Sequence, residues 1–185
     1  ISMVFQNVYL FADTIENNIK FGNPAASHEE VVKAAQKACC HEFIMSLPDG
    51  YGTVIGEGGA TLSGGEKQKI ACGSAAAIDP DIYVLDEPSS NLDAYAIADF
   101  RQLLFTLKSQ GKTIIISEHR LYYLSGLFDR VLYLKDGEIE GDYTAEEFCG
   151  LSARQRDDMG LRPLDLAGLS EVEGTPQRTN EAVWT

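Results

Sequence analysis

One short apolar run, IYVL at residues 82–85, constrains the fold of this chain more than any other feature of its sequence. Pro80 and Pro88 bound the run, so it has the length of a single strand. An uninterrupted apolar run of this length is typical of a strand buried on both faces of a parallel sheet. Asp86 and Glu87 follow directly, at the carboxyl end where open α/β sheets bind their ligands. The sequence therefore predicts an α/β fold with two carboxylates at the ligand-binding edge of its sheet.

The Asp86-Glu87 pair suits metal-assisted chemistry. A carboxylate in this position can hold Mg²⁺ directly or through water, and its neighbour can orient or deprotonate an attacking water molecule. An ordinary acidic turn is the alternative interpretation, and it is the usual one for an isolated Asp-Glu pair.

A predicted helix start precedes the strand. Ser63 and, three residues later, Glu66 have the spacing of a capping box. The start of a helix presents free N–H groups and the positive end of the helix dipole, so it can bind an anion. Gly64 and Gly65 have no Cβ to keep a phosphate away from the backbone. A well-capped helix without a ligand is the alternative, and these four residues alone do not decide between the two.

The overall composition narrows the class of protein. The 185 residues suffice for one domain with its own core, and 44% hydrophobic and 23% charged residues are normal for a globular protein. The net charge of -13 argues against a nucleic-acid partner, which would require a basic surface. No apolar run approaches the roughly 18 residues of a membrane span. The four cysteines have no CxxC spacing, which favours thiols in a reducing compartment: Cys39, Cys40, Cys72 and Cys149.

Apolar periodicity and turn signals predict the other elements. Expected helices run from a cap at Thr14 to about Lys20, from a cap at Ser27 to about Cys40, over 41–47 and over 94–110. Expected strands lie at 3–6, 113–117 and 130–134, and Asp136-Gly137 is a hairpin turn signal. Together with residues 82–86, the strands at 113–117 and 130–134 are expected to form a parallel core.

Four motifs, taken together, closely resemble those of the ATP-binding cassette (ABC) ATPases in their order and separations. LSGGE at Leu62–Glu66 resembles the family's signature motif, and residues 82–86 resemble its Walker B strand. Glu87 stands in the place of the catalytic glutamate, and SNLD at Ser90–Asp93 resembles the D-loop.

The order of these motifs also suggests a role for two single residues. Gln6 resembles the glutamine of the family's Q-loop, which in relatives reaches Mg²⁺ and the nucleophilic water. His119 stands at the position of the H-loop histidine, near the γ-phosphate. Without this context, Gln6 would be a solvated residue at a strand end, and His119 a capping or packing residue.

The resemblance implies a role for each of these side chains. Glu87, His119 and Gln6 would be catalytic, and Asp86 and Gln6 would serve Mg²⁺. ATP would be contacted, across a head-to-tail dimer, by Leu62, Ser63, Gly64, Gly65, Glu66 and Asp93.

The resemblance also implies the architecture. We expect an incomplete P-loop NTPase-like (RecA-like) α/β core of three layers, together with the helical subdomain of ABC ATPases. Residues 1–160 would form this partial ABC ATPase domain, with the helical subdomain at about 14–75 and the core from about 76. Residues 161–185 are rich in Gly, Pro, Thr and charge, so we expect a poorly ordered tail.

The phosphate loop of such an ATPase, G-x-x-x-x-G-K-[ST], should lie upstream of Gln6, where these 185 residues hold none. The GKT at 111–113 precedes a strand, and Thr106 stands where the first glycine should be, so we reject it. We therefore expect the chain to correspond to the carboxyl-terminal part of a nucleotide-binding domain and to have negligible ATPase activity by itself. Residues 3–67 resemble exporters, whereas residues 68–166 are more similar to energy-coupling-factor ATPases.

The implied function is that of the ATP-binding subunit of an ABC membrane transporter, with ATP and Mg²⁺ as cofactors. Its partners would be a second nucleotide-binding domain and transmembrane subunits or domains, at the cytoplasmic face of the cell membrane. Two alternatives remain. A soluble ABC ATPase of repair or translation would usually carry two cassettes or insertions. A non-catalytic interaction fragment is favoured by the lack of a phosphate loop.

Overall fold

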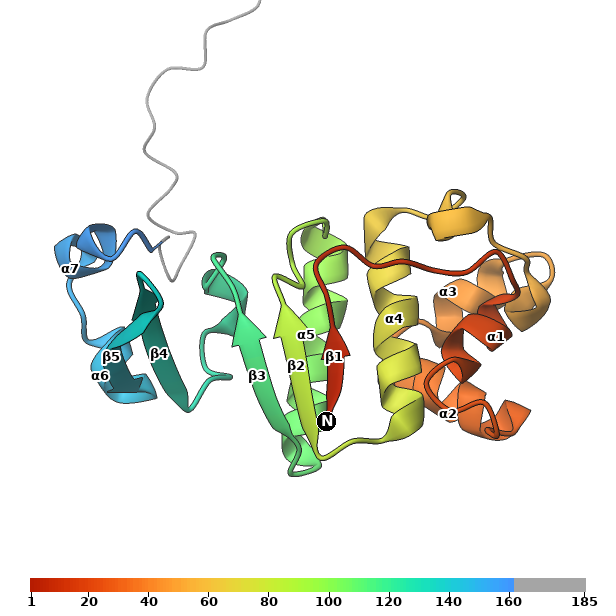
Figure 1. The fold of residues 1–185 in the computed structure, drawn as a ribbon, viewed down its shortest axis with the longest axis horizontal. Coiled ribbons are helices and arrows are strands. Elements are labelled where there is room, and N and C mark those ends of the chain that lie inside the picture. The colour runs from red at the N-terminus through yellow and green to blue at the C-terminus, as the bar shows by residue number, and fades with distance from the viewer. Residues whose placement is uncertain (162–185) are drawn as a thin grey trace, which may run out of the picture.

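The computed structural model describes residues 1–161, which form an α/β fold. Helices α1 to α4 lie at one end, a parallel sheet with α5 lies in the middle, and a small hairpin sheet lies at the other end (Figure 1). The prediction of a poorly ordered tail concerns residues that, apart from Leu161, lie outside this range. None of the helices within residues 1–161 combines the length and the apolar character that a membrane crossing requires.

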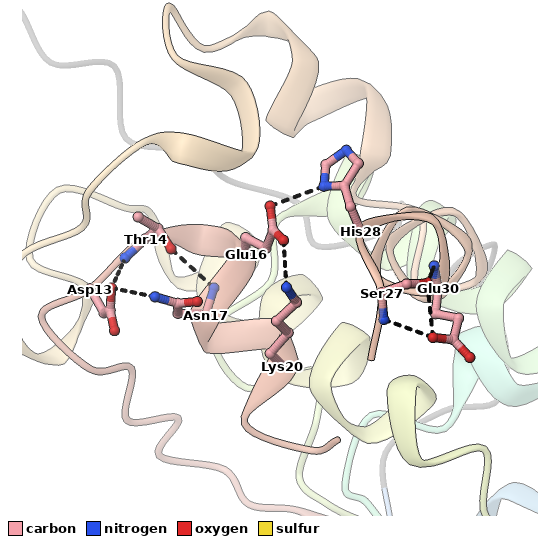
Figure 2. A network of polar contacts seen from close by, with 8 residues as sticks. All are labelled: Asp13, Thr14, Glu16, Asn17, Lys20, Ser27, His28 and Glu30. Atoms are coloured by element: carbon pink, nitrogen blue, oxygen red, sulfur yellow. Dashed lines mark hydrogen bonds and ion pairs between the residues drawn. The ribbon is translucent and has the colours of Figure 1, made fainter. Parts of the chain in front are cut away.

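Three short helices begin where the sequence predicts. They are α1 (Ile15–Lys20), α2 (His28–Lys37) and α3 (His41–Ser46). The hydroxyl of Thr14 accepts from the N–H of Asn17 at 3.1 Å, and Ser27 forms a full capping box with Glu30 (Figure 2). The prediction that the second helix reaches Cys40 is wrong. The backbone of Cys39 is left-handed (φ 54°), which ends the helical path and lets α3 begin in a new direction.

The carboxylate of Glu16 links helices α1 and α2. Glu16 on α1 bonds Lys20 at 2.7 Å one turn along its own helix and His28 at 3.0 Å on α2 (Figure 2). Beneath this exposed network, α1 and α2 pack against the longer helix α4 (Gly64–Ile78). Ile15, Ile19 and Ile70 are fully buried between them. The helical part therefore has its own apolar core.

Among the described residues, the parallel sheet has three strands, in the order β1 (Ser2–Val4), β2 (Ile82–Asp86), β3 (Thr113–Ser117). Helix α5 (Ala94–Ser109) connects β2 to β3 and buries the predicted stripe of Ile97, Phe100, Leu104 and Leu107 against the sheet. The register pairs Asp86 with Ser117. The residues that follow β2 and β3 therefore emerge at the same edge of the sheet.

The two faces of this sheet differ. Val4, Tyr83 and Leu85 are buried on the face that α5 covers, whereas Met3 and Ile115, on the opposite face, are 53% and 54% exposed. The expectation that the 82–85 strand is buried on both faces is thus confirmed for one face only within the described residues. These residues supply one helical layer and the sheet of the expected core.

The strand at 130–134 is not part of the parallel sheet, so this prediction is wrong. Strand β4 (Arg130–Lys135) pairs antiparallel with β5 (Glu138–Thr144) in a separate sheet, and α6 (Ala145–Cys149) and α7 (Ala153–Asp158) follow. Asp136 and Gly137 both have left-handed backbones (φ 50° and 84°), which is the conformation of a tight hairpin turn. The predicted turn is confirmed, and it gives β4 a neighbouring partner in sequence.

Candidate functional site

Three predicted catalytic residues meet at the carboxyl edge of the parallel sheet. The amide Nε2 of Gln6 donates to Oε2 of Glu87 at 2.7 Å, and Nε2 of His119 lies 2.9 Å from Oε1 of the same carboxylate. Gln6 follows β1, Glu87 follows β2 and His119 follows β3. Glu87 thus lies between the other two, with one oxygen engaged on each side.

Local backbone geometry places Glu87 in this position. Its N–H donates to the carbonyl of Ser117 at 2.9 Å, which extends the β2–β3 ladder by one residue beyond Asp86. Its backbone then turns left-handed (φ 40°), a conformation that few residues other than glycine adopt and that is often found at functional sites. The side chains of Glu87 and His119 remain 29% and 73% exposed, so a ligand can reach both.

Asp86 and Gln6 provide oxygen atoms suited to a hard cation. Asp86 is exposed at the end of β2, and its carboxylate makes no hydrogen bond or ion pair among residues 1–161. Gln6 uses its amide nitrogen on Glu87, which leaves its carbonyl oxygen available. In the part of the chain that the structure describes, no three His, Cys, Asp or Glu side chains form a metal cluster. The two oxygen donors fit Mg²⁺, which keeps several waters and binds phosphate oxygens, better than a metal that needs an all-protein cage.

The Leu62–Glu66 segment forms a second group of predicted site residues. Glu66 N–H donates to the Ser63 hydroxyl at 3.3 Å, and Ser63 N–H donates to the Glu66 carboxylate at 2.7 Å. The predicted capping box is confirmed, and it leaves the N–H groups of Gly64 and Gly65, in the first turn of α4, for an external acceptor.

The two glycines also serve packing, which the sequence did not reveal. A Cβ on Gly64 would lie 2.8 Å from Cβ and 3.0 Å from the carbonyl oxygen of Asn91, and one on Gly65 would lie 3.1 Å from Cβ of Ala96. The loop after β2 therefore lies directly on the start of α4. Asp93, predicted as a ligand contact, caps α5 by accepting from the Ala96 N–H at 2.8 Å.

Glu118 lies beside the cluster of three predicted catalytic residues, and the sequence analysis did not single it out. Its half-buried carboxylate is hydrogen-bonded by Tyr123, Ser89 and the two residues that follow it. Burial alone would raise the pKa of Glu118, but hydrogen bonds from Arg120, Ser89, Tyr123 and His119 outweigh it and lower the pKa. Burial, together with the charge of Glu118, raises the pKa of Tyr123. Only the position of Glu118 beside His119 could have signalled its role.

An apolar groove adjoins the Gln6 loop. It has a volume of about 410 Å³ and lies between β1 with the following loop, the end of α1 and one side of α4. Tyr9, Phe11 and Phe21 line it and are exposed. The ring of Phe11 contacts the rings of both Tyr9 and Phe21. Tyr9 also donates to Glu57 at 3.2 Å. The groove thus presents aromatic surface on the loop that carries Gln6, whose neighbours Phe5 and Asn7 line it.

The sequence is similar to those of known proteins. The sequence model of the family described as "ABC transporter" matches residues 1–90. The chain is 50% identical over 171 residues to a putative ABC transporter ATP-binding protein of Treponema denticola, covering 90% of this chain and 34% of the relative. It is 42% identical over 139 residues to the ATP-dependent lipid A-core flippase of Syntrophus aciditrophicus, covering 75% of this chain and 23% of the relative.

A solved structure shares the fold. The structure of a bacterial Atm1-family ABC exporter with ATP bound superposes with a TM-score of 0.74 at 34% identity. The match covers 87% of this chain and 28% of the exporter chain. The chain therefore spans about a third or less of the length of the relatives described here.

Proposed function

This chain belongs to the ABC transporter family as a part of its ATP-binding domain, and on that premise we propose that it couples ATP binding and hydrolysis to transport in a longer protein. The observation that carries the proposal is the meeting of Gln6, Glu87 and His119 around one carboxylate. These residues follow three different strands, and a merely structural acidic turn would not require them to converge.

ATP would bind between two such domains arranged head to tail. The free N–H groups of Gly64 and Gly65 at the start of α4 would face its terminal phosphate from one domain, since a helix start favours an anion. Asp86 and the carbonyl oxygen of Gln6 would hold Mg²⁺, which neutralises phosphate charge when it is bound.

Glu87 would orient the attacking water. His119 and Gln6 hold its two carboxylate oxygens at 2.9 and 2.7 Å, so the orientation of the carboxylate is fixed before water arrives. Such preorganisation lowers the barrier because little rearrangement is left for the reaction itself. His119, largely exposed at this edge, would donate to a γ-phosphate oxygen when nucleotide is bound.

The aromatic groove would receive the transmembrane part of the transporter. Its exposed rings, Tyr9, Phe11 and Phe21, lie on the loop and helix that directly follow Gln6. Exposed apolar patches of this kind are typical of protein–protein contacts. Movement of a partner in the groove would therefore act directly on the segment that carries Gln6.

The test uses the full-length protein that carries this chain. Glu87→Gln should reduce ATP hydrolysis about 10²- to 10⁴-fold, because the amide cannot take the proton of the attacking water. ATP binding should persist, and size-exclusion chromatography with ATP should show a trapped dimer.

Glu146→Gln is the matched control, because Glu146 is exposed on α6, away from the cluster. It should change neither activity nor elution. Unchanged hydrolysis in Glu87→Gln, or a variant that stays monomeric with ATP, would contradict the role given to Glu87.

A further inference from the structure

Glu118 and Arg120, the two residues that flank His119, form hydrogen bonds with the backbone N–H and carbonyl groups of Ser89. The N–H of Ser89 donates to Oε2 of Glu118 at 3.3 Å, and the guanidinium of Arg120 donates to the Ser89 carbonyl at 3.2 Å. Ser89 is fully buried. These two hydrogen bonds connect the loop that carries His119 to the loop that follows Glu87, and we call the Glu118–Ser89–Arg120 arrangement the Glu118 clamp.

The carboxylate of Glu118 accepts four hydrogen bonds, two on each oxygen. Oε1 accepts from the N–H groups of His119 and Arg120 at 2.8 and 3.0 Å. Oε2 accepts from Ser89 N–H and, at 2.7 Å, from the Tyr123 hydroxyl. Only an ionised carboxylate offers acceptors on both sides. A glutamine there would turn its NH₂ group toward two donors in either orientation.

Backbone hydrogen bonds connect Ser89 to the part of the loop that contacts the start of α4. Ser90 N–H donates to the Glu87 carbonyl at 3.1 Å, and Leu92 N–H donates to the Ser89 carbonyl at 3.1 Å. These bonds fold the loop into tight turns, and Asn91 at its tip packs on Gly64. The Glu118 clamp thus lies between the Glu87–His119 pair and the segment that covers the α4 start.

We propose that Glu118 is a positioning residue, which sets the distance of His119 from Glu87 and fixes the 87–92 loop against α4. Its effect on turnover rests on the function proposed above. The effect acts through placement and not through contact with nucleotide, so loss of Glu118 should slow the chemical step while ATP affinity is kept.

The activity arm uses the full-length protein that carries this chain. Glu118→Gln should lower kcat about 10- to 100-fold, with the KM for ATP within about threefold of wild type. Tyr123→Phe removes one donor and keeps the carboxylate, so its effect on kcat should be smaller. Glu146→Gln, which removes an exposed charge on α6, should leave both constants unchanged.

The second arm measures backbone hydrogen exchange by mass spectrometry in the same protein without nucleotide. Glu118→Ala, which leaves no acceptor in place of the carboxylate, should accelerate exchange in two segments, residues 118–121 and residues 87–92, because the N–H groups of Ser89, His119 and Arg120 lose their acceptors. Faster exchange in 118–121 alone, or an unchanged kcat, would overturn the proposal.

Two further outcomes are distinguishable. If the wild-type protein does not hydrolyse ATP, the proposed function fails, while the exchange at 87–92 still decides whether the clamp exists. If Glu118→Gln does not fold, Arg120→Met takes its place, because it removes only the bond to the Ser89 carbonyl. That variant should show the same division between kcat and KM, and a wild-type kcat would overturn the proposal.

Discussion

Gly64 shows how one residue can serve both a ligand and the fold. Its N–H group lies in the first turn of α4, and its missing Cβ leaves room for Asn91. Packing alone therefore requires glycine here, whatever the ligand.

We predict that Gly64→Ala destabilises the protein by about 1–3 kcal/mol, the usual cost of overpacking, and also abolishes ATP-dependent activity. The new Cβ would lie 2.8 Å from Cβ of Asn91, and the neighbouring backbone carbonyl cannot easily move. Urea denaturation measures the loss. Gly52→Ala is the control, because nothing lies within 4 Å of its Cβ position. Equal stability of the two variants would show that Asn91 does not pack on α4.

The hydrogen bonds of Glu118 make part of the stability depend on pH. The pKa of Glu118 is lowered from its ordinary value of 4.5, so the ionised form stabilises the folded state. This contribution is present above the ordinary pKa and is lost as the pH falls through the lowered pKa.

We therefore predict that the stability difference between wild type and Glu118→Gln is largest near neutral pH and shrinks as the pH falls below the ordinary value of 4.5, because the unfolded carboxyl group then binds a proton that the folded one resists. Urea denaturation at several pH values measures it. Glu146→Gln should differ little from wild type at every pH. A difference that stays constant down to pH 3 would rule out this account of Glu118.

At the scale of elements, helix starts were the most predictable features. Thr14, Ser27 and Ser63 cap the helices that the sequence assigns to them, because a cap involves only the next three residues. The fate of the 130–134 strand was not predictable in the same way. Its apolar residues fit either sheet, and the choice of partner depends on residues far away in sequence.

The α2 cap gives a prediction at this scale. Ser27→Ala should cost about 1 kcal/mol of unfolding free energy, because it removes the hydroxyl partner of the Glu30 N–H. Chemical denaturation measures the change. Ser125→Ala is a suitable control, because Ser125 is exposed and its hydroxyl makes no hydrogen bond among residues 1–161. A loss of stability in both variants would point to a cause other than the cap.

The residues of the candidate site also differ in how far the sequence could predict them. Glu87, His119 and Gln6 were predictable because their order along the chain resembles a known family, and the fold then brings them within hydrogen-bonding distance. Glu118 and Arg120 were not, because each is an ordinary charged residue until the fold brings Ser89 between them. Contacts between loops of different strands arise only from tertiary structure.

For the molecule as a whole, the exposed apolar face of the parallel sheet dominates the expected behaviour. Met3 and Ile115 lie on this face, and β3 has no partner on its outer side among the described residues. Open strand edges and large apolar patches both favour association.

We predict that the 185-residue chain self-associates or is marginally stable, despite its net charge of -13. Analytical ultracentrifugation over a range of concentrations measures association. Ile115→Thr should weaken it, because threonine keeps the strand propensity and removes apolar surface. A strictly monomeric chain with a sharp, reversible melting transition above roughly 65 °C would contradict this prediction.

The placement of β1 also affects the order in which the chain folds during its synthesis. Ser2 pairs with Tyr83, whereas the two strands of the β4–β5 hairpin adjoin each other in sequence. At about 5–20 residues per second, a ribosome needs on the order of ten seconds to synthesise the segment between β1 and β2. The helices in between can fold on local contacts during that time, while β1 is not yet paired with β2. Strand β1 thus remains without β2 for the whole interval, and during that time its edge is accessible to other nascent chains.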